Sequence, residues 1–506
     1  MRDQLALLPG YLTAHLQLTL FALLAGTAFS VPAGIAIARS RRFERPLLAV
    51  ASVIQTVPSL ALLAVMVPVL SALGLRSIGF LPAFIGLTLY SVLPILRNTV
   101  TGLSGLDPAL AEAARGVGMT PRQQLWRVDL PLAMPVILAG LRTSTVWTVG
   151  IATLSTPVGA ASLGNYIFAG LQTRNLTAVL VGCVAAALLA LALDGLVHVL
   201  GGALPGRRRA PVVGALVALG ALYAYSTVTF VQDLRHTGPD RIVVGAKTFT
   251  EQYILSHMLA LQIETSTGSP VDVAPSLGST VAFDALRAGE IDAYVDCSGT
   301  IWATIMQRAS VAVDRETVLA EVGRFLKDQH GIGVVGALGF ENAYALAMRR
   351  TQATEMGVRT IGDLTASAPR LAIGGDYEFF DRPEWRAIRN TYGIAFREQR
   401  SMDPSLMYQA VANGQVDVIS AFSTDGRISA LDLVVLDDTR GAIPPYDAVI
   451  LAGPRLVRER PDVIAALGAL TGRIDADRMR RMNMAVDRDG TAPAAVAREF
   501  LASGSH

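Results

Sequence analysis

The first half of the chain consists of long apolar runs separated by short polar loops. Six runs reach about 20 residues, the length that spans the hydrocarbon core of a bilayer. Buried helices of soluble proteins are seldom so uniformly apolar over that length. The pattern therefore predicts an all-α transmembrane domain in contact with a lipid bilayer. The six predicted spans are residues 13–38, 47–70, 79–97, 131–153, 176–200 and 211–231.

Arginines between these runs set the predicted orientation. Short basic loops remain in the cytoplasm, and three alternate loops hold most of the arginines. The opposite loops hold only Arg76 and Arg174. We therefore expect the inner membrane as the location, with everything after the sixth span on the periplasmic side. The cytoplasmic arginines are Arg39, Arg41, Arg42 and Arg45, then Arg97, Arg115, Arg122 and Arg127, then Arg207, Arg208 and Arg209.

After the sixth run the pattern changes to short strands alternating with helices. Gly238-Pro239 forms a stiff linker at the change. Alternation of this kind predicts a doubly wound α/β domain. The chain is thus predicted to hold a membrane domain over residues 1–236 and an extracytoplasmic domain over 237–506. The first elements expected in the second domain are strands at 242–245, 271–274 and 291–295, with helices at 250–264 and 280–288.

Two segments of the second domain share one layout. Residues 281–296 and 406–422 each read as an apolar helix, a glycine stop, an acidic turn and a strand. A polar loop follows each strand, at 297–302 and 423–428, and ligands of open α/β sheets bind at such strand ends. The repeat predicts two similar lobes with a ligand cleft between them.

Composition narrows the classes of function. The net charge of +2 is too small for a nucleic-acid surface. Six scattered histidines form no metal pair, and no nucleophile has a neighbouring base. Lys247-Thr248 is preceded by Ala246, where a P-loop needs glycine. We therefore expect no cofactor, no metal, no enzyme activity and no ATPase motif, so the energy for any transport comes from another polypeptide.

The loop between the third and fourth runs carries a spaced motif. Asp107-Pro108 is a good helix start, and one amphipathic helix is expected over 108–126. Glu112-Ala113-Ala114, Gly118 and Leu130-Pro131 have the spacing of the EAA loop of ABC-importer permeases, which this segment resembles. The resemblance implies that residues 108–131 couple to a separate ABC ATPase subunit. It also implies a homodimer, with Glu112, Ala113, Ala114 and Gly118 at the ATPase contact.

The second domain resembles the periplasmic binding proteins of osmoprotectant importers, of the glycine betaine, carnitine and choline type. The resemblance rests on KTFTEQYIL (247–255), LGSTVAFDALRAGEIDAY (277–294), GFENAYALAM (339–348), EFFDRPEW (378–385), residues 402–428 and PPYDAVIL (444–451). It implies a type II-like two-lobe fold, fused here to its permease. The implied cargo is a quaternary ammonium compound such as glycine betaine, choline or carnitine.

A trimethylammonium group donates no hydrogen bonds, so aromatic faces hold it best, at about 0.5–2 kcal/mol per contact. The resemblance implies that Tyr344 and Phe422 are cage walls and that Thr280 and Thr300 are donors. Arg427 is expected to pair a ligand carboxylate. The implied ligand contacts are Gln252, Thr280, Thr300, Tyr344, Phe422 and Thr424, with Arg427, Tyr377 and Asp296 added as supporting residues.

The chain departs from the family pattern at two cage positions. Leu277 and Cys297 stand where choline and carnitine proteins often have aromatic residues. Tyr377 and other aromatics of the opposite lobe are candidates to compensate, with Asp296 or Glu378 neutralising the cation. Taken singly, Phe379, Phe380 and Trp385 are expected to be core residues. A smaller wall leaves room for a bulkier betaine, such as ergothioneine.

Two other classes of protein stay open at this point. A membrane-anchored receptor or sensor also fuses spans to a binding domain, although it needs no EAA loop. An ion-coupled secondary transporter needs no ATPase, but it needs ionisable residues inside the membrane. The runs contain few of them: His15, Arg142, Asp194 and His198. Arg142 either lines a pathway or reaches back to the cytoplasmic interface.

Overall fold

The computed structural model describes residues 2–39, 44–173, 175–201, 209–236, 241–308 and 314–503. The chain divides into two compact units. One comprises Met1–Phe168 and Thr177–Gly238, and the other comprises Ala169–Leu176 and Pro239–His506. The linker Gly238-Pro239 and the loop arginines Arg41, Arg42, Arg174, Arg207 and Arg208 lie outside the described residues.

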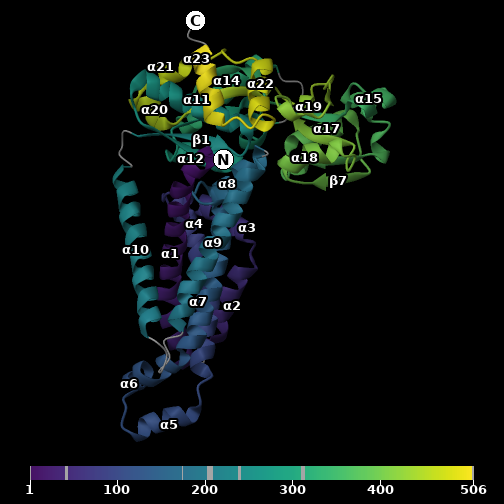
Figure 1. Cartoon of the computed structure of the whole chain (residues 1–506). Coiled ribbons are helices and arrows are strands. Elements are labelled where there is room, and N and C mark those ends of the chain that lie inside the picture. Colours follow the sequence, from purple (N-terminus) through teal and green to yellow (C-terminus); the bar gives the residue numbers. More distant parts are fainter. Residues whose placement is uncertain are drawn as a thin grey trace. The chain divides into compact units, whose positions relative to one another are not determined.

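The first unit is a bundle of long helices (Figure 1). Glycines let its central helices approach closely. A Cβ atom on Gly140 of α7 would lie 2.7 Å from the Pro94 carbonyl oxygen of α4, and one on Gly26 of α1 would meet the Ser91 side chain. The elements are α1 (Arg2–Arg39), α2 (Glu44–Thr56), α3 (Ser59–Ala72), α4 (Phe80–Ser104), α5 (Pro108–Gly116), α6 (Pro121–Gln124), η1 (Leu125–Asp129), α7 (Leu130–Ala152), η2 (Thr153–Val158), α8 (Gly164–Gln172), α9 (Leu176–Gly201) and α10 (Arg209–His236).

The second predicted span, 47–70, is wrong as a single helix. The chain bends by 99° between α2 and α3. Pro58 has no N–H group and disfavours helical conformation at Val57, which explains the break. The Val57 carbonyl group instead accepts a hydrogen bond from the Tyr90 hydroxyl group of α4. Within the described residues, five helices are long and apolar enough to cross a membrane, or six spans if the bent pair counts as one.

The expected single helix over 108–126 is also wrong. It is divided into α5 and α6, because Gly118 adopts a φ of +80° after α5 ends. The Asp107 side chain caps α5 by accepting from the Ala109 N–H group at 2.9 Å, as its sequence position predicts. Thr120 and Gln123 form a capping box that starts α6. The segment is therefore a helical hairpin that leads through η1 into α7.

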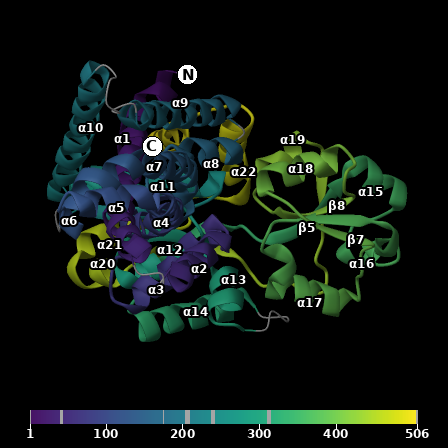
Figure 2. The same cartoon turned by 90° about the horizontal axis from the view of Figure 1, so that it is seen from below.

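The second unit contains two five-stranded sheets. The sheet of the second lobe, with β5, β7 and β8, can be followed in Figure 2. The first lobe has the strand order β2-β1-β3-β10-β4, and the second has β7-β6-β8-β5-β9. In the first lobe, β1 is parallel to β2 and β3, whereas β10 is antiparallel to β3 and β4. The strands are β1 (Ile242–Lys247), β2 (Val271–Leu277), β3 (Ala293–Cys297), β4 (Gly333–Glu341), β5 (Tyr344–Arg349), β6 (Ala372–Gly375), β7 (Glu398–Ser401), β8 (Val418–Phe422), β9 (Leu433–Leu436) and β10 (Asp447–Ala452).

The repeat seen in the sequence occupies equivalent places in the two lobes. Its strands become β3 and β8, each third in the order of its sheet. Both sheets are mixed, with parallel and antiparallel strand pairs. The reason is the chain path: β5 and β10 each enter a sheet from the opposite lobe and pair antiparallel with its central strand. The lobes are therefore joined by two crossovers, β4 to β5 and β9 to β10.

Helices cover both sheets and begin close to where the sequence predicts them. The expected helix at 250–264 is α11, which runs three residues further, and the expected strand at 291–295 begins at Ala293. Helices α21, α22 and α23 pack on α11 of the first lobe. The helical elements are α11 (Thr250–Thr267), α12 (Ser279–Ala288), α13 (Ser298–Thr300), η3 (Ile301–Ile305), α14 (Arg315–His330), α15 (Arg350–Met356), α16 (Ile361–Leu364), η4 (Ala368–Arg370), η5 (Phe379–Asp381), α17 (Pro383–Tyr392), α18 (Pro404–Ala412), α19 (Gly426–Ala430), α20 (Pro454–Glu459), α21 (Pro461–Gly468), α22 (Ala476–Asp487) and α23 (Pro493–Ser503).

Candidate functional site

Aromatic side chains gather where the two lobes meet. Tyr344 at the start of β5 is paired with Phe422 at the end of β8, and their ring centroids lie 5.0 Å apart. From the first lobe, Phe249 stacks on Phe422 at 5.9 Å with an interplanar angle of 6°. Tyr446 of the second crossover approaches Tyr344 edge-on at 6.3 Å. The structure thus brings together the two predicted cage walls and adds Phe249 and Tyr446.

A buried arginine lies on the face of Tyr344. The Arg382 guanidinium group is 4.9 Å from the Tyr344 ring centroid. It forms an ion pair with Glu384 at 3.0 Å, and it donates at 3.2 Å to the Thr304 hydroxyl group of the first lobe. The Tyr446 hydroxyl group donates to Glu384. Arg382 therefore links both lobes through a site that already accommodates a cation.

The first lobe contributes a second buried ion pair. Lys247 at the end of β1 contacts Asp296 at the end of β3. Asp296 also accepts from the Tyr294 hydroxyl group at 2.5 Å and from the Cys297 backbone N–H group at 2.7 Å. The predicted supporting residue Asp296 thus has its charge balanced by Lys247. Burial raises the pKa of the Cys297 thiol, so this side chain remains protonated at neutral pH.

The predicted polar contacts differ in their surroundings. Gln252 is buried, and its side-chain Nε2 atom has no hydrogen-bond partner within the described residues. Thr280 is exposed at the start of α12, and Thr300 is half-buried at the end of α13. Thr424 is buried and donates to Glu251 at 2.6 Å. Their roles as ligand contacts stay predictions.

Arg427 and Tyr377 lie in different environments from the aromatic cluster. Arg427 is buried in an ion pair with Asp425 at 2.5 Å, and its guanidinium group lies 4.0 Å from the Tyr408 ring centroid. Tyr377 is 66% exposed. Phe379 and Trp385, expected as core residues, are fully buried, although Phe379 also lies 5.4 Å from Tyr344.

Sequence reasoning missed four residues of this region: Lys247, Phe249, Arg382 and Tyr446. All four lie in segments that carry the family resemblance, namely KTFTEQYIL, EFFDRPEW and PPYDAVIL. Their place in these motifs was the only feature of the sequence that could have identified them as site residues. The described residues contain no cluster of His, Cys, Asp or Glu that could hold a metal ion.

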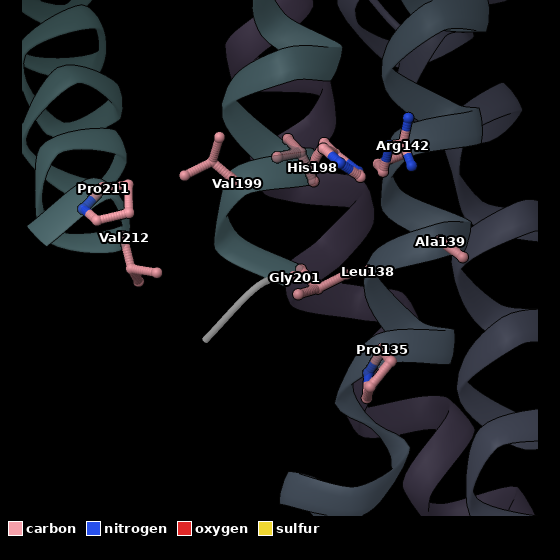
Figure 3. Close-up of a pocket in the computed structure, with 10 residues that line it drawn as sticks. Pro135, Leu138, Ala139, Arg142, His198, Val199, Gly201, Pro211 and Val212 are labelled. Atoms are coloured by element: carbon pink, nitrogen blue, oxygen red, sulfur yellow. The ribbon is translucent and has the colours of Figure 1, made fainter. Parts of the chain in front are cut away.

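The membrane unit has a cavity of about 490 Å³ between α7, α9 and α10 (Figure 3). Arg142 of α7 and His198 of α9 line it together with apolar residues. Arg142 donates to both carboxylate oxygens of Asp194 at 2.8 Å. This bidentate pair neutralises the arginine and joins two helices, so it has a structural explanation.

The hairpin of α5 and α6 presents most of its motif residues to solvent. Glu112, Ala113 and Gly118 are exposed, while Ala114 is buried. Large apolar side chains are exposed beside them, with Val117 at 73% and Trp126 at 70%. An apolar exposed surface of this kind is typical of a protein contact.

The two halves of the chain match two family models. Residues 240–503 match the substrate-binding domain of ABC-type glycine betaine transport systems. Residues 30–204 match the inner membrane component of binding-protein-dependent transport systems. Both models describe transport components.

Three relatives are transport proteins by name. The ergothioneine transport permease/ergothioneine binding protein EgtU of Helicobacter pylori (strain G27) is 31% identical over 90% of this chain and 83% of its own length. The choline transport system permease protein OpuBB of Bacillus subtilis (strain 168) is 42% identical over 36% of this chain and 80% of its own length. The carnitine transport binding protein OpuCC of Listeria monocytogenes is 30% identical over 53% of this chain and 88% of its own length.

Proposed function

Because the chain belongs to the family of ABC importer subunits that fuse a permease to a glycine betaine-type binding domain, we propose that it captures a betaine and passes it through the inner membrane. The binding domain, residues 237–506, takes up the ligand outside the cytoplasm. The permease domain, residues 1–236, forms the path across the membrane. The separation of the chain into two compact units supports this division.

The aromatic cluster at the lobe junction carries the proposal. Tyr344 and Phe422 come from the second lobe, and Phe249 comes from the first. A trimethylammonium group bound there gains ring faces from both lobes, so it favours their closed arrangement. The Arg382 guanidinium group already lies over Tyr344, which supports the affinity of this wall for cations.

We assign the carboxylate of the ligand to Arg382 instead of Arg427. Both arginines already pair with a carboxylate, but Arg427 lies over Tyr408, whereas Arg382 lies over the cage wall Tyr344. Arg382 is buried beside Tyr344 and reaches Thr304 across the junction. A betaine carries its positive and negative groups a few bonds apart, so one molecule can contact Tyr344 and Arg382 together. Gln252, whose Nε2 atom has no partner in the part of the chain that the structure describes, is the further donor.

Within the betaines, the chain is proposed to take a bulky member such as ergothioneine. Cys297 at the end of β3 provides a smaller side chain than an aromatic residue, and Leu277 is fully buried in its lobe. The relative that aligns along most of this chain is named for ergothioneine transport and binding. Glycine betaine, carnitine and choline are the alternative ligands within the class.

We further propose six spans, with α2 and α3 counted as one, and a homodimer served by separate ATPase subunits. The exposed surface of Ala113, Val117 and Trp126 is the proposed ATPase contact. Closure of the ATPases then moves the α5–α6 hairpin, and η1 transmits this movement to α7 because the two are continuous.

Calorimetric titration of the purified full-length protein with ergothioneine, glycine betaine, carnitine and choline tests the ligand class. We expect saturable binding of at least one betaine. Tyr344→Leu should weaken it by roughly 10-fold, whereas Tyr377→Leu, where the side chain is exposed, should leave it unchanged. No binding of any of the four compounds would refute the betaine assignment. Binding without ATP-driven uptake would favour a receptor or sensor.

A further inference from the structure

Glu251 occupies the point where the lobes and the first crossover meet. It is the second residue of α11, and it is only 2% exposed. Its Oε1 atom accepts from Asn342 Nδ2 of the β4–β5 crossover at 2.8 Å. Its Oε2 atom accepts from the Thr424 hydroxyl group of the second lobe at 2.6 Å and from Asn483 Nδ2 of α22 at 3.5 Å. One carboxyl group thus joins the first lobe, the crossover and the second lobe.

The direct partners of Glu251 are all neutral, which sets it apart from most buried acids of this unit. Among the described residues, other buried carboxylates contact an arginine or lysine: Asp292, Asp296, Glu384, Asp425 and Asp447. Threonine and asparagine can donate to a carboxylate or accept from a carboxylic acid. Asn342 Oδ1 and Asn483 Oδ1 are buried without a partner within the described residues, so acceptors for such a proton are available after an amide flip.

We propose that Glu251 is a protonation-controlled latch that holds the lobes together. It also positions Thr424 and Gln252, the residue that follows Glu251 in the chain, for ligand binding. The inference rests on the betaine-binding function proposed above and adds a regulation of the same site. Glu251 is a positioning residue, because it acts on the ligand through Thr424 and Gln252. Protonation favours the joined state, and ionisation weakens it.

The charged groups around the latch do not hold the carboxylate in its ionised form. Asp425, which follows Thr424, faces Glu251 and is paired with Arg427. On the strand side, Lys247 is paired with Asp296. From α22, Asp487 accepts from Thr250, and Arg480 contacts Asp477 and the Ser423 carbonyl group. The neutral Cys297 thiol is a further titratable neighbour.

The direction of the pH effect follows from burial. Burial raises the pKa of Glu251 to about 7, because the hydrogen bonds from Thr424, Asn342 and Asn483 offset only part of the cost of removing the charge from water. When the lobes separate, Thr424 leaves, water reaches the carboxyl group, and its pKa falls toward the ordinary range. Joining the lobes therefore takes up a proton, and this contribution is lost as pH rises through about 7.

Ligand titration of the full-length protein in nanodiscs at pH 6 and pH 8 tests the latch. The probes are ergothioneine and glycine betaine. We expect binding about tenfold tighter at pH 6, with uptake of about half a proton at pH 7 measured in two buffers of different ionisation heat. Glu251→Gln keeps the hydrogen bonds and removes the titration, so its affinity should be the same at both pH values.

The matched control is Glu264→Gln, an exposed acid on the same helix, which should keep the full pH dependence. A pH dependence that persists in Glu251→Gln, or that is absent from the unmodified protein, would overturn the latch. Failure of both probes to bind would instead refute the betaine function. A second measurement then tests whether Glu251 acts as a latch.

That second measurement needs no ligand. Thermal unfolding of the binding domain is followed by the fluorescence of Trp302 and Trp385, in a full-length chain with Trp126 and Trp147 replaced by Phe. Glu251→Gln should raise the melting temperature at pH 8 and have little effect at pH 5, since the unmodified residue is protonated there. Equal shifts at both pH values would overturn the proposal.

Discussion

The permease unit and the binding unit place their functional residues in opposite environments. In the α5–α6 hairpin, Glu112, Ala113 and Gly118 are exposed and lie within seven residues of sequence. In the binding unit, Tyr344, Phe422 and Arg382 are largely or fully buried, and long-range packing brings them together. A surface that docks a partner can be read as a local motif, whereas a buried ligand site is assembled by the fold. Substitutions in the hairpin should therefore reduce transport without changing ligand affinity, and substitutions in the buried site should reduce ligand affinity.

Ala113→Trp should have the largest effect. The bulky ring obstructs a proposed ATPase contact that needs small side chains, so ATP-driven uptake should fall to the level of vesicles without ATPase. Ligand affinity should be unchanged, because the binding unit is not altered. Arg115→Trp, on the opposite face of α5, is the control and should retain most uptake. Normal uptake by Ala113→Trp would show that this surface does not couple the permease to the ATPase.

Arg382→Lys should weaken binding of a betaine by about 30-fold, because lysine keeps the charge but loses the planar fork that can hold a carboxylate and Glu384 together. Titration of the variant with a betaine and with choline measures the effect. Choline lacks a carboxylate, so any affinity for it should change less. Arg400→Lys, in an exposed ion pair with Glu398, is the control. Equal losses for both ligands would argue against the carboxylate assignment.

Tyr344→Leu should weaken binding by roughly 10-fold, the loss of one desolvated cation–π contact. Tyr344→Phe should retain most of the affinity, since it preserves the ring face. Calorimetry of both variants at one pH gives the comparison. If the two variants lose affinity equally, Tyr344 acts through its hydroxyl group and is not a cage wall.

Thr280→Val should have the smallest effect, about threefold or less, because Thr280 is exposed and a single neutral hydrogen bond contributes little. The same substitution at Thr424 should cost more, since Thr424 is buried against Glu251. Ligand titration of the two variants compares their losses of affinity. A larger loss at Thr280 would place it inside the closed cleft.

Sequence reasoning performed best where the signal is local. Long apolar runs identified the membrane helices, and the cap at Asp107-Pro108 marked the start of α5. The break at Pro58 was missed, because its size depends on how α2 and α3 pack on α4. Arg382 was missed as a site residue because nothing in EFFDRPEW indicates that its guanidinium group lies on Tyr344. Arg427 was chosen by its place after β8, and its pairing with Asp425 two residues earlier was overlooked.

The central claim is that one chain both captures a betaine and carries it across the membrane, with energy from a separate ATPase. Uptake of labelled ergothioneine or glycine betaine into proteoliposomes, with this chain alone and with its ATPase, tests it most directly. The account predicts uptake only when the chain, the ATPase and ATP are all present, and its loss in Tyr344→Leu at low ligand concentration. Uptake by the chain alone, driven by an ion gradient, would contradict it.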